Sequence, residues 1–351
     1  MLCSLRVLAA IILLVAAPYS LAAVILQYHH VSETAPKVTS VTPAQFKEQM
    51  QYLADNHFQV VPLTEVVASI KAKKALPAKT VAITFDDGYR STFDTAHPIL
   101  QAFGFPYTVF VSIAPTAKGY RDMMSWPQLQ QLAQQGATIA NHSYRHDHLI
   151  RRLADETEAQ WLARVTRDIL ATESEIKAKT GQSVKLLAYP YGEYNTRLQA
   201  LLTEVGFVGL GQQSGAAGPY SLLTALPRFP VAGAYADMDS LKVKLAARNM
   251  PVVSSSPTNP ELADGHWQPR LQVTLEMADI NPAQLRCYLP GQAAVKPQWI
   301  SADSFQVQAL KPLPAGRSRY NCTVPSKHGH GYYWFSQSWV RPDDQGQWLI
   351  E

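Results

Sequence analysis

The sequence predicts an α/β domain, built as a closed or nearly closed barrel of parallel strands, followed by a small all-β domain. From Val24 onward, short β-rich runs alternate with helical patterns, which is typical of repeated β–α units. Seven or eight such units within about 230 residues favour a barrel, and a doubly wound sheet is the alternative. Near Pro251 the pattern changes to alternating strand runs without a good helix.

The N-terminus has the pattern of a secretory signal peptide. An apolar stretch, residues 7–17, follows Arg6, is short for a bilayer span, and runs into Ser20-Leu21-Ala22. We expect cleavage after Ala22 and export to the periplasm or beyond, with no stable transmembrane segment left afterwards. An uncleaved anchor or a buried first helix is the alternative.

The barrel is expected over residues 23–250. Its helices are marked by N-cap residues followed by proline or by a closing glycine. The expected strands are Val24–Tyr28, Gln59–Pro62, Thr80–Phe85, Tyr107–Ser112, Thr138–Ala140, Lys185–Tyr189, Phe207–Leu210 and Arg228–Val231. The clearest helices are Ala44–Asn56, Gln128–Gln135 and Asp155–Lys179.

A Pro- and Ser-rich segment, residues 251–260, is expected to be a linker. Residues 261–351 then predict a small antiparallel β-sandwich, whose role the sequence leaves open. Its strand runs are Leu271–Met277, Phe305–Leu310 and Tyr332–Val340. Cys287 and Cys322 both lie in this domain, and an oxidising compartment would favour a disulfide between them. Two buried free thiols are the alternative.

The composition restricts the class of protein. With 47% hydrophobic and 17% charged residues over 351 positions, the chain is neither disordered nor collagen-like. A net charge of +4 without a long basic run gives little reason to expect a nucleic-acid partner. We expect a monomer.

Polar residues follow the apolar strands at the end where parallel strands converge. They are Tyr28-His29-His30, Asp86-Asp87-Gly88, the stretch from Asn141 to His146, Tyr189-Pro190-Tyr191-Gly192, and Arg228. Two adjacent carboxylates at a partly buried strand end repel each other unless a cation is present. His142 and His146 are four residues apart, so a helical turn or a tight loop would bring both imidazoles to one side, as metal binding requires.

These residues resemble a known family. Thr84-Phe85-Asp86-Asp87-Gly88, followed by the stretch from His142 to Leu149, is similar to the first two motifs of the polysaccharide deacetylases, carbohydrate esterase family four. The resemblance covers roughly residues 24–250. It implies a distorted (β/α) barrel and hydrolysis of N- or O-acetyl groups on a polysaccharide.

The resemblance implies a role for each matching residue. Asp87, His142 and His146 would hold a divalent metal and Asp86 would be the general base. Zinc suits two histidines and one aspartate best, while iron, cobalt and nickel stay possible. The metal would polarise the acetyl carbonyl and activate a water, whose proton Asp86 takes. The backbone N–H of Tyr191 would stabilise the oxyanion.

Two departures from the family pattern matter. Ala188 stands where the family usually has an arginine that orients the base, and no histidine occurs between His148 and His266 to act as the late general acid. Tyr28-His29-His30-Val31 resembles an early motif of the poly-β-1,6-N-acetylglucosamine deacetylases of biofilm systems, which implies that His29 is the acid. Arg228 would then replace the missing arginine.

Alternatives remain for several residues. For His29, the alternative is a structural role in capping a strand. His148 is an alternative third metal ligand. Tyr191 and Trp126 could each contact sugar or line the core. The leading hypothesis is an exported N-deacetylase acting on an N-acetylglucosamine polymer. An O-acetyl esterase and a non-catalytic glycan-binding protein are the alternatives.

Overall fold

The computed structural model describes residues 19–20, 22–263 and 265–349. The expected signal peptide therefore lies almost wholly outside the described residues, and its cleavage stays a prediction. Within the described ranges, no helix is both long enough and apolar enough to cross a membrane.

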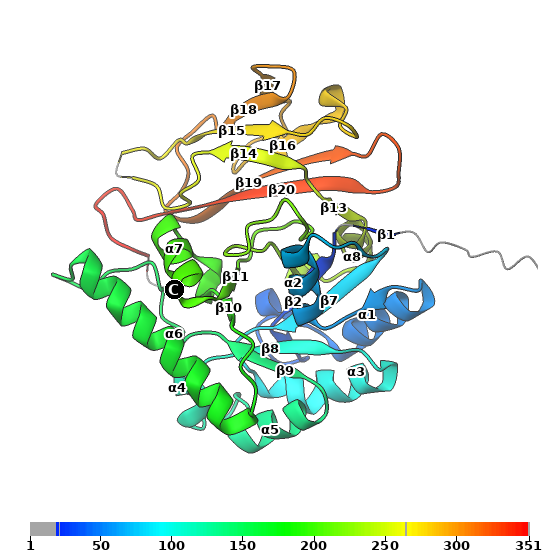
Figure 1. Ribbon diagram of the computed structural model, residues 1–351, viewed down its shortest axis with the longest axis vertical. Coiled ribbons are helices and arrows are strands. Elements are labelled where there is room, and N and C mark those ends of the chain that lie inside the picture. The colour runs from blue at the N-terminus through cyan, green and yellow to red at the C-terminus, as the bar shows by residue number, and fades with distance from the viewer. Residues whose placement is uncertain (1–18, 21, 264, 350–351) are drawn as a thin grey trace, which may run out of the picture.

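The first domain is a curled sheet of parallel strands, in the spatial order β12-β2-β7-β8-β9-β10-β11, with β5 paired to β7 (Figure 1). Every expected barrel strand is present. The strands are β2 (Val24–Tyr28), β5 (Gln59–Val60), β7 (Thr80–Phe85), β8 (Tyr107–Val111), β9 (Thr138–Asn141), β10 (Leu186–Ala188), β11 (Val208–Leu210) and β12 (Phe229–Pro230). The predicted distorted barrel is confirmed.

Residues 226–230 close the barrel between its first and last strands. Leu226 forms a parallel bridge with Leu210 at the end of β11. The Arg228 N–H donates to the carbonyl oxygen of Gln213 at 3.0 Å. The next residue, Phe229, pairs with Leu26 of β2. This closure brings Arg228 to the inner face of the barrel.

Helices cover the outside of the sheet. They are α1 (Pro43–Asp55), α2 (Leu63–Ala72), α3 (His97–Phe103), α4 (Ile113–Ala117), α5 (Trp126–Gln134), α6 (Glu158–Thr180), α7 (Thr196–Val205) and α8 (Met238–Leu245). The three expected helices are confirmed within a few residues. The Thr42 and Thr157 side chains accept hydrogen bonds from the N–H groups of Gln45 and Gln160, which supplies α1 and α6 with N-caps.

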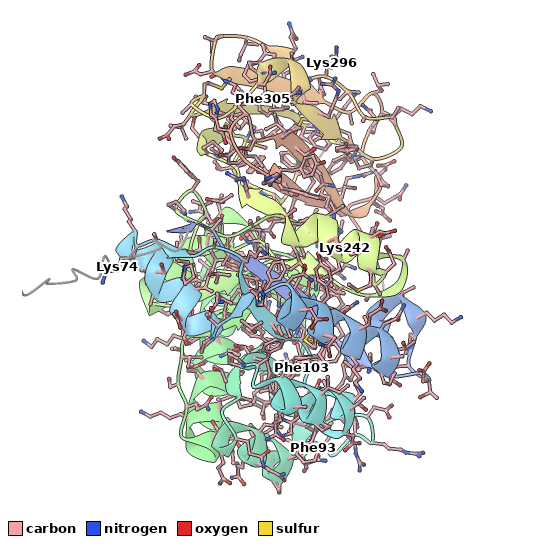
Figure 2. The ribbon with its side chains drawn as sticks, turned by 90° about the vertical axis from the view of Figure 1, so that its right-hand side faces the viewer. Lys74, Phe93, Phe103, Lys242, Lys296 and Phe305 are labelled. Atoms are coloured by element: carbon pink, nitrogen blue, oxygen red, sulfur yellow. A yellow bond between two sulfur atoms is a disulfide. The ribbon has the colours of Figure 1, made fainter. Side chains whose placement is uncertain are left out.

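The second domain consists of two sheets with their own apolar core, which confirms the predicted β-sandwich (Figure 2). All strand pairings in the two sheets are antiparallel except that of β13 with β20. One sheet has the order β13-β20-β19-β16 and the other β14-β15-β18-β17. Their strands are β13 (Ala247–Asn249), β14 (Val252–Ser256), β15 (Arg270–Leu275), β16 (Arg286–Tyr288), β17 (Gln298–Trp299), β18 (Ser304–Gln308), β19 (Gly316–Pro325) and β20 (Tyr332–Arg341). Two short pairings, β1 (Tyr19–Ser20) with β6 (Leu76–Pro77) and β3 (His30–Val31) with β4 (Ser40–Val41), lie beside the barrel.

The segment expected as a linker is not an unstructured connection. Residues 252–256 form β14, which pairs with β15. Most of its side chains are exposed, so it lacks the apolar alternation by which sequence reveals a strand. The exact domain boundaries stay a prediction.

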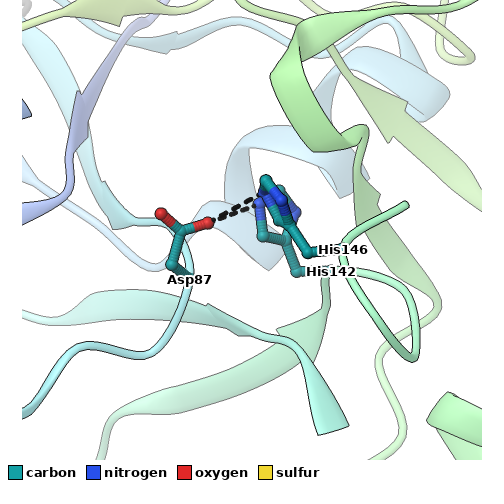
Figure 3. Close-up of side chains that lie close together, drawn as sticks. All are labelled: Asp87, His142 and His146. Carbon is teal, nitrogen blue, oxygen red and sulfur yellow. Dashed lines mark ion pairs between the residues drawn. The ribbon is translucent and has the colours of Figure 1, made fainter. Parts of the chain in front are cut away.

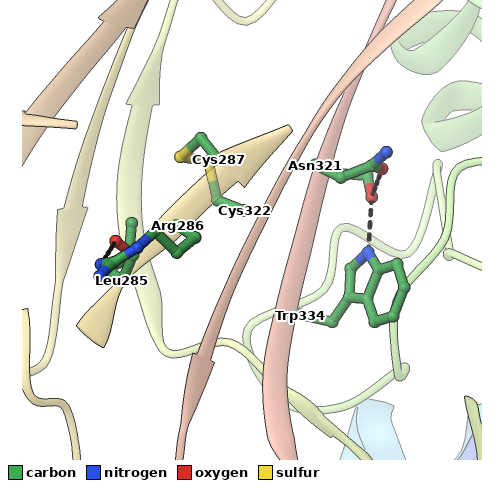
Figure 4. The surroundings of a disulfide bond; sticks show 7 residues. Leu285, Arg286, Cys287, Asn321, Cys322 and Trp334 are labelled. Atoms are coloured by element: carbon green, nitrogen blue, oxygen red, sulfur yellow. Dashed lines mark hydrogen bonds between the residues drawn. A yellow bond between two sulfur atoms is a disulfide. The ribbon is translucent and has the colours of Figure 1, made fainter. Parts of the chain in front are cut away.

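Cys287 and Cys322 form the expected disulfide, which links the paired strands β16 and β19 (Figure 4). The sheet containing β19 and β20 faces the barrel (Figure 1). There the Trp334 ring packs edge-on against Phe229 at 5.2 Å. In addition, β13, which directly follows the barrel, pairs in parallel with β20. The two domains therefore share both a sheet and an aromatic contact.

Candidate metal centre

Two strand ends bring three potential metal ligands together. Asp87 follows β7, whereas His142 and His146 follow β9. One oxygen of Asp87, Oδ1, lies 3.0 Å from His142 Nε2 and 3.1 Å from His146 Nε2 (Figure 3). One ligand atom from each residue falls within 4.8 Å of the others. The family resemblance implied that these three residues lie close together, and in the structure they do.

The loop that carries the histidines is held by its own hydrogen bonds. The Asn141 side chain accepts from the Ser143 N–H at 3.0 Å, and the Ser143 hydroxyl accepts from the His146 N–H at 3.0 Å. Ser143 and His146 both have left-handed backbone angles, with φ of +65° and +64°. A tight loop, the second of the two predicted arrangements, therefore brings the imidazoles to one side.

The surroundings of the three residues fit a bound cation. His142 Nδ1 donates to the Ala188 carbonyl at 2.7 Å, which leaves the Nε2 lone pair directed at Asp87. The buried Asp87 Oδ1 receives no well-aligned hydrogen bond from the described residues, although both imidazole nitrogens are near. Burial acts to raise the pKa of Asp87, but the two histidines outweigh it and hold that pKa well below its ordinary value.

Asp86 is fully buried and held in its ionised form. Arg228, also fully buried, donates to its two oxygens at 2.7 and 2.8 Å. Gln27 Nε2 donates to Oδ2 at 2.6 Å. Burial alone would raise the pKa of Asp86, yet the Arg228 charge and hydrogen bonds lower it below the ordinary value. Arg228 therefore contacts Asp86 from a position 40 residues after Ala188, and its equivalence to the family's arginine stays a prediction.

His29 and His30 follow β2 and differ in their surroundings. His29 is half-buried and contributes to lowering the pKa of both Asp86 and Asp87, so it lies on the same face. His30 instead stacks on the Tyr89 ring, with centroids 3.6 Å apart. Of the two, only His29 acts on the pKa of Asp86, whereas the Asp87 charge also acts on the pKa of His30.

Tyr191 lies in a 3-10 turn, Pro190–Gly192, after β10. Its backbone is left-handed, with φ of +59°. The Tyr191 ring meets the His146 ring edge-on at 4.6 Å and stacks on His148 at 3.7 Å. His148 Nδ1 contacts Glu193 Oε2 at 2.7 Å and is not part of the ligand cluster. His148 therefore contacts the turn and lies outside the cluster of candidate ligands.

Sequence reasoning missed three residues here. Gln27 could have been noticed as a polar residue within a strand whose side chains are all buried. Glu193 directly follows the third motif, but nothing in its sequence context indicated its contact with His148. Arg317 comes from the second domain and lies 3.4 Å from Glu193 Oε1, a contact that no sequence pattern would predict.

Trp126 begins α5 and packs, half-buried, against the barrel core.

Residues 73–210 match the sequence profile of the family described as polysaccharide deacetylase. This stretch of the chain is a polysaccharide deacetylase domain. The matched stretch contains Asp86, Asp87, His142, His146 and the Tyr191 turn, so the polysaccharide deacetylase profile covers the candidate metal centre. His29 and Arg228 lie outside the matched stretch.

Two relatives are named poly-β-1,6-N-acetyl-D-glucosamine N-deacetylase. The one from Escherichia coli (strain K12) is 25% identical over 246 residues, which cover 60% of this chain and 36% of that protein. The one from Staphylococcus aureus (strain MSSA476) is 25% identical over 209 residues, which cover 57% of this chain and 71% of the relative. The chain therefore spans little more than a third of its E. coli relative.

The barrel is also similar to the solved structure of the Streptococcus pyogenes deacetylase PplD in complex with acetate. The TM-score is 0.58 at 21% identity, covering 64% of this chain and 99% of that one. At that identity the likeness establishes the shared fold alone.

Proposed function

We propose that this polysaccharide deacetylase is a metal-dependent hydrolase that removes N-acetyl groups from a polymer of N-acetylglucosamine. The observation that carries the proposal is a buried, ionised carboxylate, Asp86, directly beside the three ligand residues Asp87, His142 and His146. The names of the two relatives support β-1,6-linked N-acetylglucosamine as the substrate class.

Asp87, His142 and His146 would hold the divalent cation, for which zinc is the first choice. When bound, such a cation polarises the acetyl carbonyl and lowers the pKa of a water molecule. Asp86 accepts the proton of the attacking water because Arg228 and Gln27 keep its carboxylate ionised and fixed in direction. The Tyr191 N–H, in its left-handed turn, donates to the carbonyl oxygen as negative charge develops there.

His29 donates a proton to the leaving nitrogen in this mechanism. An amine is a poor leaving group unless it is protonated, so amide cleavage needs an acid on the catalytic face. His29 follows β2 on that face. The sequence has no histidine between His148 and His266 that could serve as the family's late general acid.

We also infer that the protein acts outside the cytoplasm, as a monomer and without a nucleic-acid partner. The signal-like N-terminus, the polymeric substrate and the Cys287–Cys322 disulfide all support export.

Acetate release tests the proposal on a panel of β-1,6 and β-1,4 N-acetylglucosamine oligomers, peptidoglycan and acetylxylan. We expect turnover of the glucosamine oligomers and loss of at least 100-fold in kcat for Asp86→Asn. Asp94→Asn removes a surface carboxylate that pairs with Arg90, and should retain wild-type turnover. Full activity in Asp86→Asn would defeat the proposal.

His29→Ala distinguishes an amidase from an esterase on the same panel. Amide turnover should collapse while turnover of an acetyl ester largely survives, because an alkoxide leaves more readily than an amine. His328→Ala, an exposed histidine of the second domain, is the matched control. Equal losses for both substrates would contradict the role of His29.

A further inference from the structure

The second domain contributes to a cleft next to the catalytic turn. Both domains line this cleft, which we name the interdomain cleft: Tyr191, Gln212 and Gln213 come from the barrel, and Arg317, Arg319 and Ser338 from the sandwich. Tyr191 connects it to the metal centre, because its ring contacts the ligand His146. A polymer chain lying across the metal centre would therefore extend into the interdomain cleft.

Strand β19 directs two arginines into this cleft. Along β19, Tyr320 and Cys322 face the sandwich core, so residues of odd number face the barrel. The Arg317 guanidinium lies over the Tyr191 ring, 5.3 Å from its centroid. Arg319 Nη1 donates to the backbone carbonyl of Gln212, which follows β11, at 3.1 Å.

The two arginines differ in how their charge is balanced. Arg317 lies 3.4 Å from the buried Glu193 carboxylate, which His148 also contacts. Arg319 bonds to a neutral carbonyl, and the described residues place no carboxylate within ion-pair distance of it. Glu193 also lines the cleft, where it balances Arg317, so the net positive charge of the cleft comes from Arg319.

We propose that the interdomain cleft is a sugar subsite that accepts an N-acetylated residue and rejects a glucosamine. This inference rests on the proposed function and adds a specificity to it. Guanidinium and amide N–H groups can donate to the hydroxyl and acetyl oxygens of a neutral sugar. The ammonium group that deacetylation creates is repelled by Arg319, since like charges a few Å apart near a protein surface change affinity by about tenfold.

The consequence is a spaced pattern of deacetylation. Once one sugar has been converted to glucosamine, its ammonium group disfavours every position of the polymer that places this glucosamine in the interdomain cleft. The neighbouring residue is then hydrolysed more slowly than it is in a fully acetylated chain. Arg319 acts in this account as a specificity-determining residue and not as a catalytic one.

The test compares two β-1,6-linked pentamers. One is fully N-acetylated, and the other has a single glucosamine next to the reacting residue, on the side of the interdomain cleft. That side is identified by measuring both pentamers that have a glucosamine next to the reacting residue. We expect kcat/KM to be about tenfold higher for the fully acetylated pentamer. Arg319→Gln should reduce this ratio to about one to three, and Arg319→Lys, which keeps the charge, should preserve it. Arg270→Gln removes a strand arginine of the other sheet, far from the cleft, and should behave as wild type.

Calorimetric titration of metal-stripped wild-type protein with the acetylated pentamer and with pentaglucosamine measures the same preference without turnover. Tighter binding of the acetylated pentamer that depends on Arg319 supports the subsite, even if no acetate is released and the proposed function fails. A ratio that Arg319→Gln leaves unchanged, in binding and in turnover, would overturn the subsite.

Discussion

At the scale of single residues, the centre depends on one buried ion pair. Asp86 and Arg228 are both fully buried, and each would be costly without the other. The sequence could predict Asp86 and the three ligands because their motifs are local. It could only suggest Arg228, since the contact joins residues 142 positions apart, and it did not reveal Gln27. Long-range pairing of this kind follows from barrel closure, which sequence motifs do not encode.

Arg228→Gln should raise the pKa of Asp86, because burial then acts without the opposing charge. A larger fraction of the base is protonated at any given pH, so the acidic limb of the kcat/KM profile should move to higher pH. Near neutral pH we expect at least a tenfold loss of activity, and a loss of about 3–5 kcal/mol in the free energy of unfolding.

The pH profile of acetate release and urea unfolding together measure both effects. Arg197→Gln, which removes a surface arginine paired with Glu158, should change neither. An unshifted acidic limb in Arg228→Gln would show that the ion pair does not set the state of the base.

At the scale of elements, the turns after the strands determine the geometry. Strand and helix periodicity predicted the barrel strands, the helices α1, α5 and α6, and the sandwich strands β15, β18 and β20, because apolar spacing and caps are local signals. The exposed strand β14 was missed, since its serines carry no apolar alternation. The tight turn Pro190–Gly192 is the element on which the proposed oxyanion contact depends. Gly192 has φ of +70°, and an added Cβ would lie 2.6 Å from the Gln212 Cβ.

Gly192→Ala should therefore displace the turn and lower kcat at least tenfold, while zinc binding to the three ligands stays unchanged. Gly104→Ala is the control for backbone strain alone, since Gly104 has φ of +66° with no atom within 4 Å of the added Cβ. Acetate release and zinc titration give the two readouts. Equal kcat values for wild type and Gly192→Ala would contradict the importance of the turn.

At the scale of the whole molecule, the β-sandwich is joined to the barrel and lines the catalytic side. The sequence predicted both domains and the disulfide, because composition and cysteine positions differ between the two parts. It could not predict the interdomain cleft, since contacts such as Arg319 with Gln212 depend on how the folded domains pack. The second domain thus lines a cleft beside the candidate metal centre.

Replacing both Cys287 and Cys322 by alanine should lower the free energy of unfolding of the sandwich by about 3–4 kcal/mol, because the bridge closes a loop with a sequence separation of 35 residues. Urea unfolding followed by the tryptophan fluorescence of this domain measures the loss. A change below about 1 kcal/mol would show that the paired strands hold the loop without the disulfide.

The central claim is that Asp87, His142 and His146 hold the metal on which deacetylation depends. Zinc titration of the chelator-treated protein, with acetate release from a β-1,6 N-acetylglucosamine pentamer followed at each step, tests it most directly. We predict that activity is lost on chelation and returns in proportion to zinc up to one equivalent, and that His142→Ala neither binds that equivalent nor recovers. Turnover by the stripped protein, or full zinc-dependent recovery in His142→Ala, would contradict the account.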